Sequence, residues 1–586
     1  MNILLVSREF PPFRGGGIGT YTEHAARALT DAGHRAVVLT VSHDGTGSCE
    51  PHGSDQRVLV HRLPLVMGED WSRPAPAIDS PETRAMFEQL GPWSVLSRSV
   101  ALALPGIVRE HGIDVVEAPE CGALLWWTLN DRWIGRKGPE RADGSEPLFV
   151  VHVHSPNEWI DRENRQAAPR RASLELRHAE RESARRADVV ICPSRDLAAW
   201  VGTSWRVPRV HVVPYPLGSI AVAADPGRHF EGSVRVLLVG RMEPRKGVDV
   251  LLRAMVIAAR RGLDIRVLLA GQDTIDARTG APFGRRSLNT IVPVAMRSRV
   301  QALGKLGPEG LAAARQDANI AAAPGAFDNF PYAAMESMAC GLPMLAPRFG
   351  GVSELVRDRV DGLLFEPHDA ADLARAMLAY GSLGARECAA MGRSAAARVG
   401  AFCANVGAVR ERERLFSAAL AERAEGRTGH VAETLGVAFV GTPNPDLARI
   451  VASGRAAYAV GWTGRSKSAS TLSAGLTPTL AAHRDLRTES VALREDLLHL
   501  ANEALGSSPD ASDLIEWLIA EGREGAIDPS VNDHACSGPT GNTEAPAVSS
   551  LAHDVEAFRS GAPIRMARRT HPFPWPVVRT GPSATP

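Results

Sequence analysis

The chain has 586 residues, more than one hydrophobic core usually serves, which predicts at least two domains. Hydrophobic residues make up 44% of it and charged residues 23%, values that exclude an intrinsically disordered or membrane-embedded protein. Acidic and basic residues balance at 66 each, so no excess of positive charge favours nucleic acid as a partner.

Cysteines and apolar runs predict the compartment. The seven cysteines lie far apart without a Cys-x-x-Cys pair, so the sequence indicates neither a disulfide framework nor a zinc site. A strand-like apolar run follows the N-terminal methionine without the basic segment of a signal peptide, and no stretch of eighteen apolar residues occurs. We therefore expect a cytoplasmic protein.

The first part of the chain alternates short apolar runs with helical patterns. A helical pattern at 18–32 lies among strand-like runs at 3–6, 36–41, 115–117, 149–153 and 189–192. Apolar runs of this length between helices are typical of a parallel sheet. The sequence predicts an α/β, Rossmann-like domain over residues 1–222.

A second alternation follows a linker of small residues. Strand-like runs occur at 234–239, 265–270, 319–323 and 343–346, and a helical pattern at 406–424 ends the region. These predict a second doubly wound domain over 233–425, with a ligand site between the two domains. Residues 430–525 are expected to form a small extra module, and 526–586, rich in Pro, Ser, Thr, Gly and Ala, a disordered tail.

Glycines follow the first strand-like run. Gly16 and Gly17 lie in the segment FRGGGIGTY, just before the helical pattern. Backbone without Cβ atoms can approach an anion closely, and a helix N-terminus carries partial positive charge. We expect this loop to face the diphosphate or the sugar of a ligand, although a tight strand-to-helix turn explains the glycines as well.

A second loop, GRMEPRKG at 240–247, follows the first strand of the second domain and carries Arg241 and Lys246. Open α/β sheets bind ligands at the carboxyl ends of their strands. Lysine occurs only at 137, 246, 305 and 467, which favours a function for Lys246. Two fixed cations here would stabilise the charge of a leaving nucleoside diphosphate without a metal ion.

Two carboxylates lie in the segment FDNFPYAAMESMACG. Asp328 precedes a short predicted helix and Glu336 lies within it, while Pro331 suits its first position and Gly341 its C-terminal end. Carboxylates accept hydrogen bonds from hydroxyls, so these two could bind different hydroxyls of one sugar nucleotide. Two acids eight residues apart predict no function by themselves, so the prediction for this pair depends on the motifs around it.

In this order and spacing, the segments resemble family 4 of the retaining glycosyltransferases over roughly residues 1–425. They are the glycine-rich loop with GHRAVVLT after it, EAPE at 117–120, VHVHSP at 151–156, ADVVICPS at 187–194, GRMEPRKG, and the block at 323–367. The resemblance implies the GT-B fold, in which two Rossmann-like domains face each other. It also implies that Arg241 and Lys246 hold the donor diphosphate, Glu336 the ribose and Asp328 the donor sugar.

The resemblance extends to the residues around the transferred sugar. His154, after the VHVHSP strand, matches the family's active-site histidine, whereas His152 is expected to be structural. Backbone near Asn329 and Phe330 would help to hold the sugar. Asp328 stands where the family usually has glutamate, and Pro-Gly at 324–325 replaces a frequent Pro-Ser, so the reach toward the sugar is expected to differ.

The implied reaction is transfer of a sugar from a UDP-, GDP- or ADP-sugar to an unidentified glycan, lipid-linked or small-molecule acceptor. The anomeric configuration would be retained by front-face attack, in which the departing phosphate helps to take the acceptor proton. No cofactor is expected, and since no Asp-x-Asp motif ends a strand, we expect activity without a divalent metal.

Other functions stay open at this point. A nicotinamide oxidoreductase is disfavoured because no acid ends the second strand. A non-catalytic scaffold that binds sugar nucleotides, a sugar phosphorylase and a nucleotide-sugar epimerase would share the fold. An arginine-rich helical pattern at 165–186 could dock on the inner face of a membrane, but its interleaved acids favour a solvated, ion-paired surface.

Overall fold

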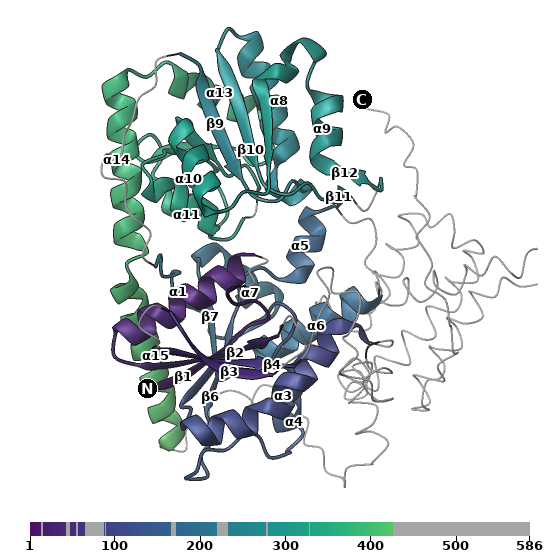
Figure 1. The fold of residues 1–586 in the computed structure, drawn as a ribbon, viewed down its shortest axis with the longest axis vertical. Helices are drawn as coiled ribbons and strands as arrows, with labels where there is room; N and C mark the ends of the chain where they lie inside the picture. The colour runs from purple at the N-terminus through teal and green to yellow at the C-terminus, as the bar shows by residue number, and fades with distance from the viewer. Residues whose placement is uncertain are drawn as a thin grey trace, which may run out of the picture.

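The computed structural model describes residues 1–425 apart from 13–15, 43–46, 54–56, 65–86, 88–89, 166–170, 219–231, 277–278 and 327. The extra module expected at 430–525 and the tail expected at 526–586 lie outside the described residues. Figure 1 shows two α/β parts, each built on its own sheet, which we call the N-terminal half (residues 1–218) and the C-terminal half (residues 232–404).

The N-terminal half contains a sheet of eight described strands. In spatial order they are β3 (Ser48–His52), β4 (Val58–Leu63), β2 (Arg35–Val41), β1 (Asn2–Val6), β5 (Val115–Pro119), β6 (Leu148–His152), β7 (Val189–Cys192) and β8 (His211–Val212). β3 pairs antiparallel with β4, and the other described pairs are parallel. Central strands such as β5 are buried along their length because helices cover both faces of the sheet.

The described helices of this half are α1 (Gly17–Asp31), α3 (Pro92–His111), α4 (Trp126–Trp133), α5 (Asn157–Glu163), α6 (Arg171–Arg186) and α7 (Arg195–Ser204). α7 begins where the Ser194 hydroxyl accepts a hydrogen bond from the Leu197 N–H at 3.2 Å, a standard N-cap. The expected helix at 18–32 and the strands of this half are confirmed to within a few residues.

The C-terminal half contains a parallel sheet of six described strands. In spatial order they are β13 (Val300–Gly304), β10 (Ile265–Ala270), β9 (Val234–Val239), β14 (Ile320–Ala322), β15 (Met344–Pro347) and β16 (Gly362–Phe365). A two-stranded hairpin pairs β11 (Ile275–Asp276) with β12 (Ala281–Pro282). The expected strands are confirmed, whereas β13 and β16 were not predicted. β13 is largely exposed, so it lacks the continuous apolar run by which the other strands were recognised.

The remaining described helices are α8 (Val248–Arg260), α9 (Phe283–Ile291), α10 (Pro308–Asp317), α11 (Tyr332–Ala339), α12 (Gly351–Leu355), α13 (Ala370–Gly381), α14 (Ala385–Phe402) and α15 (Asn405–Ala424), with 3-10 turns η1 (Pro244–Lys246) and η2 (Val294–Arg299). We expected Pro331 at the first helical position of this segment, but it is the N-cap of α11. None of the described helices is both long and apolar enough to cross a membrane.

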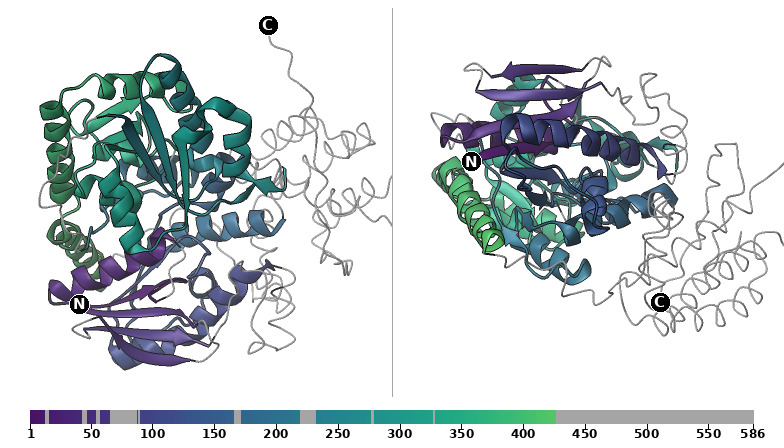
Figure 2. Two further views of the ribbon diagram at one scale, coloured as in Figure 1. Left: turned by 45° about the horizontal axis from the view of Figure 1, so that its top comes forward. Right: turned by 90° about the horizontal axis from the view of Figure 1, so that it is seen from below.

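α14 and α15 follow one flank of the molecule, α14 beside the C-terminal half and α15 beside the N-terminal half (Figures 1 and 2). α15 is held to the N-terminal half by polar contacts, among them a hydrogen bond between Glu413 and His34 at 2.7 Å and an ion pair between Arg423 and Asp188 at 2.5 Å. One apolar cluster continues across both halves, from Ile3 of β1 to Phe416 of α15. The two halves are therefore joined by a common apolar cluster as well as by the passage of the chain from α14 to α15.

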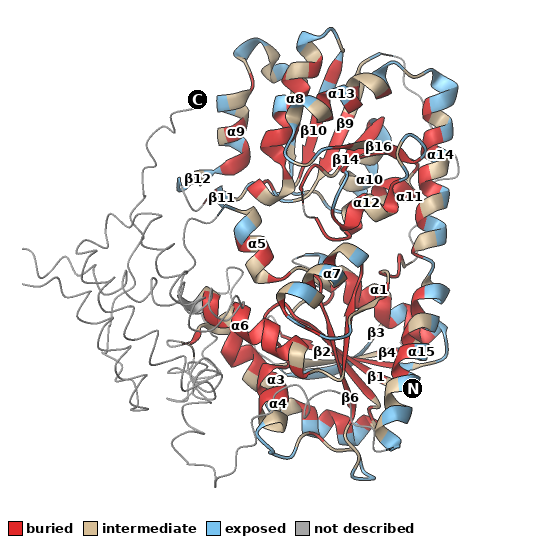
Figure 3. Cartoon of the chain, turned by 180° about the vertical axis from the view of Figure 1, so that it is seen from behind, coloured by how far each residue is buried: buried red, intermediate tan, exposed pale blue. Residues whose placement is uncertain are grey.

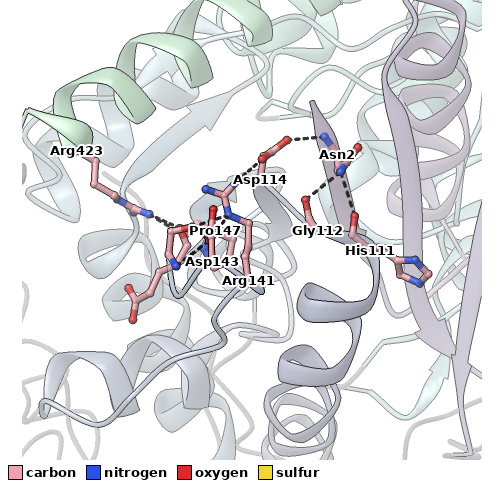
Figure 4. A network of polar contacts seen from close by, with 10 residues as sticks. Asn2, His111, Gly112, Asp114, Arg141, Asp143, Pro147 and Arg423 are labelled. Atoms are coloured by element: carbon pink, nitrogen blue, oxygen red, sulfur yellow. Dashed lines mark hydrogen bonds and ion pairs between the residues drawn. The ribbon is translucent and has the colours of Figure 1, made fainter.

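The amino-terminal edge of the first sheet is closed by hydrogen bonds between loops (Figure 4). The Asn2 backbone N–H donates to Asp114 at 2.8 Å, and its side-chain amide donates to the carbonyls of His111 and Gly112. Arg423 of α15 donates to the Pro147 carbonyl at 2.9 Å in the same network. The hydrogen bonds at this edge stabilise the fold. We expect ligands to bind at the opposite edge, where the strands have their carboxyl ends.

The arginine-rich pattern at 165–186 differs from the expectation. The described helix in this range is α6, which begins only at Arg171, and it is largely buried against α4 and α5 (Figure 3). Glu180 and Arg181 are at most 1% exposed, and Arg186 is stacked over the Trp133 ring at 4.4 Å. The expectation of ion pairs is confirmed, but that of a solvated surface was wrong, because the arginine stems and tryptophan rings pack together.

Candidate active site

In each sheet the direction of the strand order reverses beside one strand, and the loops that follow the strands at this point face the other half. In the C-terminal sheet β10 lies on one side of β9 and β14 on the other; in the N-terminal sheet β2 and β5 flank β1 in the same way. Ligands bind at the carboxyl ends of strands at such switch points. The GRMEPRKG loop follows β9 and the Asp328 segment follows β14, so the topology brings the two predicted donor segments together.

The loops after β9 and β14 pack backbone to backbone. A Cβ on Gly247 would lie 2.5 Å from the Pro324 carbonyl oxygen, and Gly247 has a φ of +68°. A Cβ on Gly325 would lie 2.4 Å from the Arg245 carbonyl oxygen. Both positions therefore require glycine, which gives the Pro-Gly pair at 324–325 a physical reason.

Lys246 and Asp328 form the centre of the site. The Lys246 Nζ donates to Asp328 Oδ2 at 2.6 Å, and an Arg245 Nη1 atom lies 3.5 Å from Asp328 Oδ1. Burial alone would raise the pKa of the Asp328 carboxyl, but Lys246 and Arg245 outweigh it and hold that pKa below its usual value. Burial also lowers the pKa of Lys246, which the pairing with Asp328 only partly offsets.

Two arginines accompany Lys246 in this loop. Arg241 is exposed, and its guanidinium lies 3.5 Å from Glu243. Arg245, which sequence analysis did not single out, is largely buried and pairs with the same glutamate at 2.7 Å. Its position directly before Lys246 could have pointed to it, and the structure places both residues in the same short 3-10 turn. The loop thus presents three cations, each within ion-pair distance of a buried carboxylate.

Glu336 lies apart from this pair. It is on α11, as expected, but its carboxylate forms an ion pair with Arg315 of α10. The side chain is 25% exposed. The structure does not bring Glu336 into contact with Lys246 or Asp328, so its proposed contact with a ribose stays a prediction.

His154 lies at the end of β6, in the N-terminal half. Its Nδ1 is 2.5 Å from the Tyr215 hydroxyl, and its backbone N–H donates to Glu120 at 2.7 Å. Burial keeps the pKa of His154 well below its usual value, helped by the neighbouring His152 and Arg412, so the ring is neutral at pH 7. Its Nε2 is buried and has no hydrogen-bond partner among the described residues, which leaves one ring nitrogen for a ligand.

His152 is fully buried in a separate network, as expected for a structural residue. Its Nδ1 lies 2.9 Å from the Tyr21 hydroxyl and 3.2 Å from Glu117. Arg412 of α15 pairs with the same glutamate at 3.5 Å. The His152 ring stacks on the His154 ring with centroids 4.2 Å apart, so the hydrogen bonds of His152 help to fix the position of His154.

Asn329 and Phe330 lie between Asp328 and α11. Phe330 is fully buried with a φ of +59°, and its ring packs edge to face on Tyr215 at 5.9 Å. The Asn329 side chain is also buried and hydrogen-bonded to the N-terminal half. The side chains of both residues are engaged by protein, so any contact with a sugar falls to their backbone groups.

The glycine loop is only partly as expected. Gly16 and Gly17 are exposed at the N-terminus of α1, and a Cβ at Gly17 would meet nothing within 4 Å. A Cβ at Gly16 would lie 3.6 Å from a carboxylate oxygen of Glu9, so that acid sits beside the helix N-terminus. The tight packing falls on Gly19, whose Cβ would lie 3.1 Å from Glu9 Cβ. The proposed contact of Gly16 and Gly17 with a diphosphate is a prediction.

Two fully buried glutamates hold the loops beside His154. Glu120 accepts hydrogen bonds from the His154 and Ser155 N–H groups, and Glu180 accepts one from the Asn157 N–H at 2.9 Å. Burial raises the pKa of Glu120 to about 7, and burial together with the charge of Glu120 raises that of Glu180 to about 8. Both residues anchor the loop after β6.

We expect the stability of the protein to fall as the pH rises from 7 to 8. A carboxyl whose pKa is raised on folding stabilises the native state at pH values below the unfolded pKa of 4.5, and this contribution is lost as the pH rises through 7 and 8. Each group contributes a slope of at most about 1.4 kcal/mol per pH unit. Urea unfolding at several pH values should show a flatter dependence in Glu120→Gln and Glu180→Gln.

The buried histidines do not change the stability of the protein between pH 7 and 8. Burial lowers the pKa of His152 to about 4 and that of His178 to about 3, so their stabilising contribution is lost only as the pH falls below 6.5. Wild-type stability that rises between pH 7 and 8 would contradict the assigned pKa values.

Comparison with known proteins bears on the whole arrangement. The family model described as "Glycosyl transferase 4-like domain" matches residues 16–218, and the one described as "Glycosyl transferases group 1" matches residues 233–381. The two together cover more than half of the chain. A glycogen synthase of Mycobacterium tuberculosis (strain ATCC 25618 / H37Rv) is 26% identical over 403 residues, 64% of this chain and 85% of that protein.

A D-inositol 3-phosphate glycosyltransferase of Nocardia farcinica is 33% identical over 178 residues, 29% of this chain and 39% of that protein. Among solved structures, a sucrose-phosphate synthase from Thermosynechococcus elongatus superposes with a TM-score of 0.56 at 22% identity, over 72% of this chain and 99% of that one. The catalytic domain of starch synthase IV from Arabidopsis thaliana gives 0.50 at 14% identity, over 72% and 99%. With the two facing sheets described above, these matches show that the chain belongs to family 4 of the glycosyltransferases and has the GT-B fold.

Proposed function

We propose that this enzyme transfers a sugar from a nucleoside diphosphate sugar to a hydroxyl acceptor with retention of configuration and without a metal ion or cofactor. The observation that carries the proposal is the partly buried contact between Lys246 and Asp328, 2.6 Å long, beside a loop with two further cations. Cations fixed at the carboxyl end of a strand stabilise the charge that develops on a leaving diphosphate.

Each site residue has a role in this proposal. Lys246, Arg245 and Arg241 hold the diphosphate, helped by the backbone at Gly16 and Gly17. Asp328 accepts hydrogen bonds from sugar hydroxyls, and the Asn329 and Phe330 backbone completes that pocket. Glu336 binds the ribose after exchanging its pairing with Arg315.

The acceptor side lies in the N-terminal half. His154 presents its neutral Nε2 near the transferred sugar, while Tyr215 and Glu120 fix its ring and backbone. The relatives named glycogen synthase and inositol phosphate glycosyltransferase both act on polyhydroxyl compounds by their names, which favours a glycan or a small polyol over a lipid-linked acceptor. The six cysteines of the described part are free, which fits a reducing, cytoplasmic compartment.

Ligand-induced stabilisation is the direct test. The purified protein is heated with UDP, GDP or ADP, and with their glucose derivatives, in buffer containing EDTA. One nucleotide at 100 times its Kd should stabilise the fold by about 2.7 kcal/mol, and Glu336→Ala should weaken this effect. The stabilising donor then enters assays with glycan and polyol acceptors, where NMR of the product shows the anomeric configuration.

Each alternative has its own signature in these experiments. No stabilisation by any nucleotide or donor would contradict the proposal, whereas stabilisation without any turnover would favour a non-catalytic scaffold. Turnover that needs inorganic phosphate would indicate a phosphorylase, and conversion of the donor without an acceptor would indicate an epimerase. Activity that EDTA abolishes and Mg²⁺ restores would overturn the metal-independent mechanism.

A further inference from the structure

Asn329 connects the donor loop to the N-terminal half. Its side-chain Nδ2 donates to the His154 carbonyl at 2.6 Å, and its Oδ1 accepts from the Ser194 hydroxyl at 2.6 Å. The residue is 6% exposed, so both hydrogen bonds are shielded from water. One amide from the loop after β14 thus reaches the ends of β6 and β7, two strands of the other sheet.

A second asparagine makes the reciprocal contact on the cation loop. Asn164, after α5 in the N-terminal half, accepts a hydrogen bond from the Arg245 backbone N–H at 3.1 Å. Next to it, Arg165 pairs with Asp249 of α8 at 3.2 Å. Both loops that carry the donor residues are therefore contacted from the opposite half in this arrangement.

The contacts of Asn329 need an amide. The His154 carbonyl requires a donor and the Ser194 hydroxyl, which is also the N-cap of α7, supplies one, so the bridging side chain must donate at one end and accept at the other. An aspartate would place a carboxylate against the His154 carbonyl oxygen. There is also little room for a shift, because a Cβ on Gly351 would lie 2.9 Å from Asn329 Oδ1.

We propose that Asn329 is a positioning residue that holds His154 and Asp328 in register, so that the acceptor side and the donor-sugar side are aligned only when the two halves are closed. Asp328 precedes Asn329 in the chain and is fixed by Lys246, while His154 receives the amide through its own carbonyl. The inference rests on the proposed function. It assigns the Asn329 side chain to alignment rather than to sugar binding.

The test separates alignment from donor binding. UDP, GDP, ADP and their glucose derivatives are titrated separately into wild type, Asn329→Ala and Asn329→Asp by calorimetry, and turnover is measured with the donor that the wild type uses. We expect the Kd of both the nucleotide and the sugar donor to change less than about twofold, while kcat falls about 10²-fold, the cost typical of a reacting group misplaced by about 1 Å. Small-angle scattering of the donor-bound variants should show a larger radius of gyration than the wild type.

Asn319→Ala is the matched control. Asn319 is equally buried, 6% exposed, and accepts a hydrogen bond from the Arg235 N–H at 2.6 Å, entirely within the C-terminal half. Its loss should lower the melting temperature and leave kcat within a few-fold. If donor affinity falls as far as kcat in Asn329→Ala, the residue is a donor ligand and the inference is wrong. Unchanged kcat overturns it too, and a wild type that binds no nucleotide overturns the proposed function and this inference together.

Discussion

Replacing Lys246 by alanine is expected to lower kcat/KM for the donor by about 10² to 10³-fold, the loss typical of one fixed group that stabilises developing negative charge. The Lys246 side chain is 18% exposed and lies 2.6 Å from Asp328, in a loop whose backbone is fixed against the loop after β14. A preorganised cation of this kind needs no rearrangement as the diphosphate departs. Steady-state kinetics with the donor identified by thermal stabilisation gives the measurement.

The chain supplies a matched control for this change. Lys137 is 86% exposed and pairs with Glu140 at 3.4 Å, so Lys137→Ala removes the same side chain from the surface. It should leave both kcat and KM unchanged, because an exposed ion pair contributes little. A loss below about fivefold in Lys246→Ala would mean that Arg241 and Arg245 suffice for the diphosphate, which would contradict the central role given to Lys246.

Replacing Arg412 by alanine is expected to destabilise the fold by about 3 to 5 kcal/mol, since it leaves a buried carboxylate without its partner. Arg412 and Glu117 are each 2% exposed and 3.5 Å apart, and Arg412 also donates to the Tyr21 hydroxyl at 2.6 Å. Burial would raise the pKa of Glu117, but Arg412, His152 and Tyr21 outweigh it and hold that pKa at about 2. Urea unfolding at pH 7 measures the loss.

Arg414, two residues further along α15, is the control. It is 64% exposed and pairs with Glu411 at 2.5 Å, so Arg414→Ala should cost less than about 1 kcal/mol. The double variant Arg412→Met with Glu117→Gln should regain part of the stability, because it removes both charges of the buried pair. If Arg412→Ala unfolds at the same urea concentration as Arg414→Ala, α15 is not anchored to the N-terminal half through this pair.

Local patterns were enough for much of the fold and of the donor side. The apolar runs that became β9 and β14 were recognisable because buried parallel strands are continuously apolar. The loop after β9 was predicted as a ligand site from its place at the end of a strand and from its scarce lysine, and that after β14 from its motif and the family resemblance. The structure brings Lys246 and Asp328 into contact across 82 residues of sequence. Lysine scarcity pointed to Lys246, but Arg245 was missed because arginine is common in this chain.

Burial was harder to predict than secondary structure. The charges of α6 suggested a solvated face, since charged residues are seldom fully buried unless they are paired. In the structure they are paired and covered by tryptophans, as Arg186 over Trp133 illustrates. A sequence pattern gives the charges of a helix but not the surface against which the helix packs.

From the sequence alone we could predict most strands of the two sheets and the residue types that we propose bind a diphosphate and a sugar. Tertiary structure alone decided which of these groups meet: Tyr215 against His154, Arg412 against Glu117, and Asn329 between the two halves. The reason is the separation along the chain over which each kind of interaction acts. Secondary structure follows from propensity and periodicity over a few residues, whereas the pairing of Arg412 with Tyr21 joins residues 391 positions apart, which only packing of the whole chain can specify.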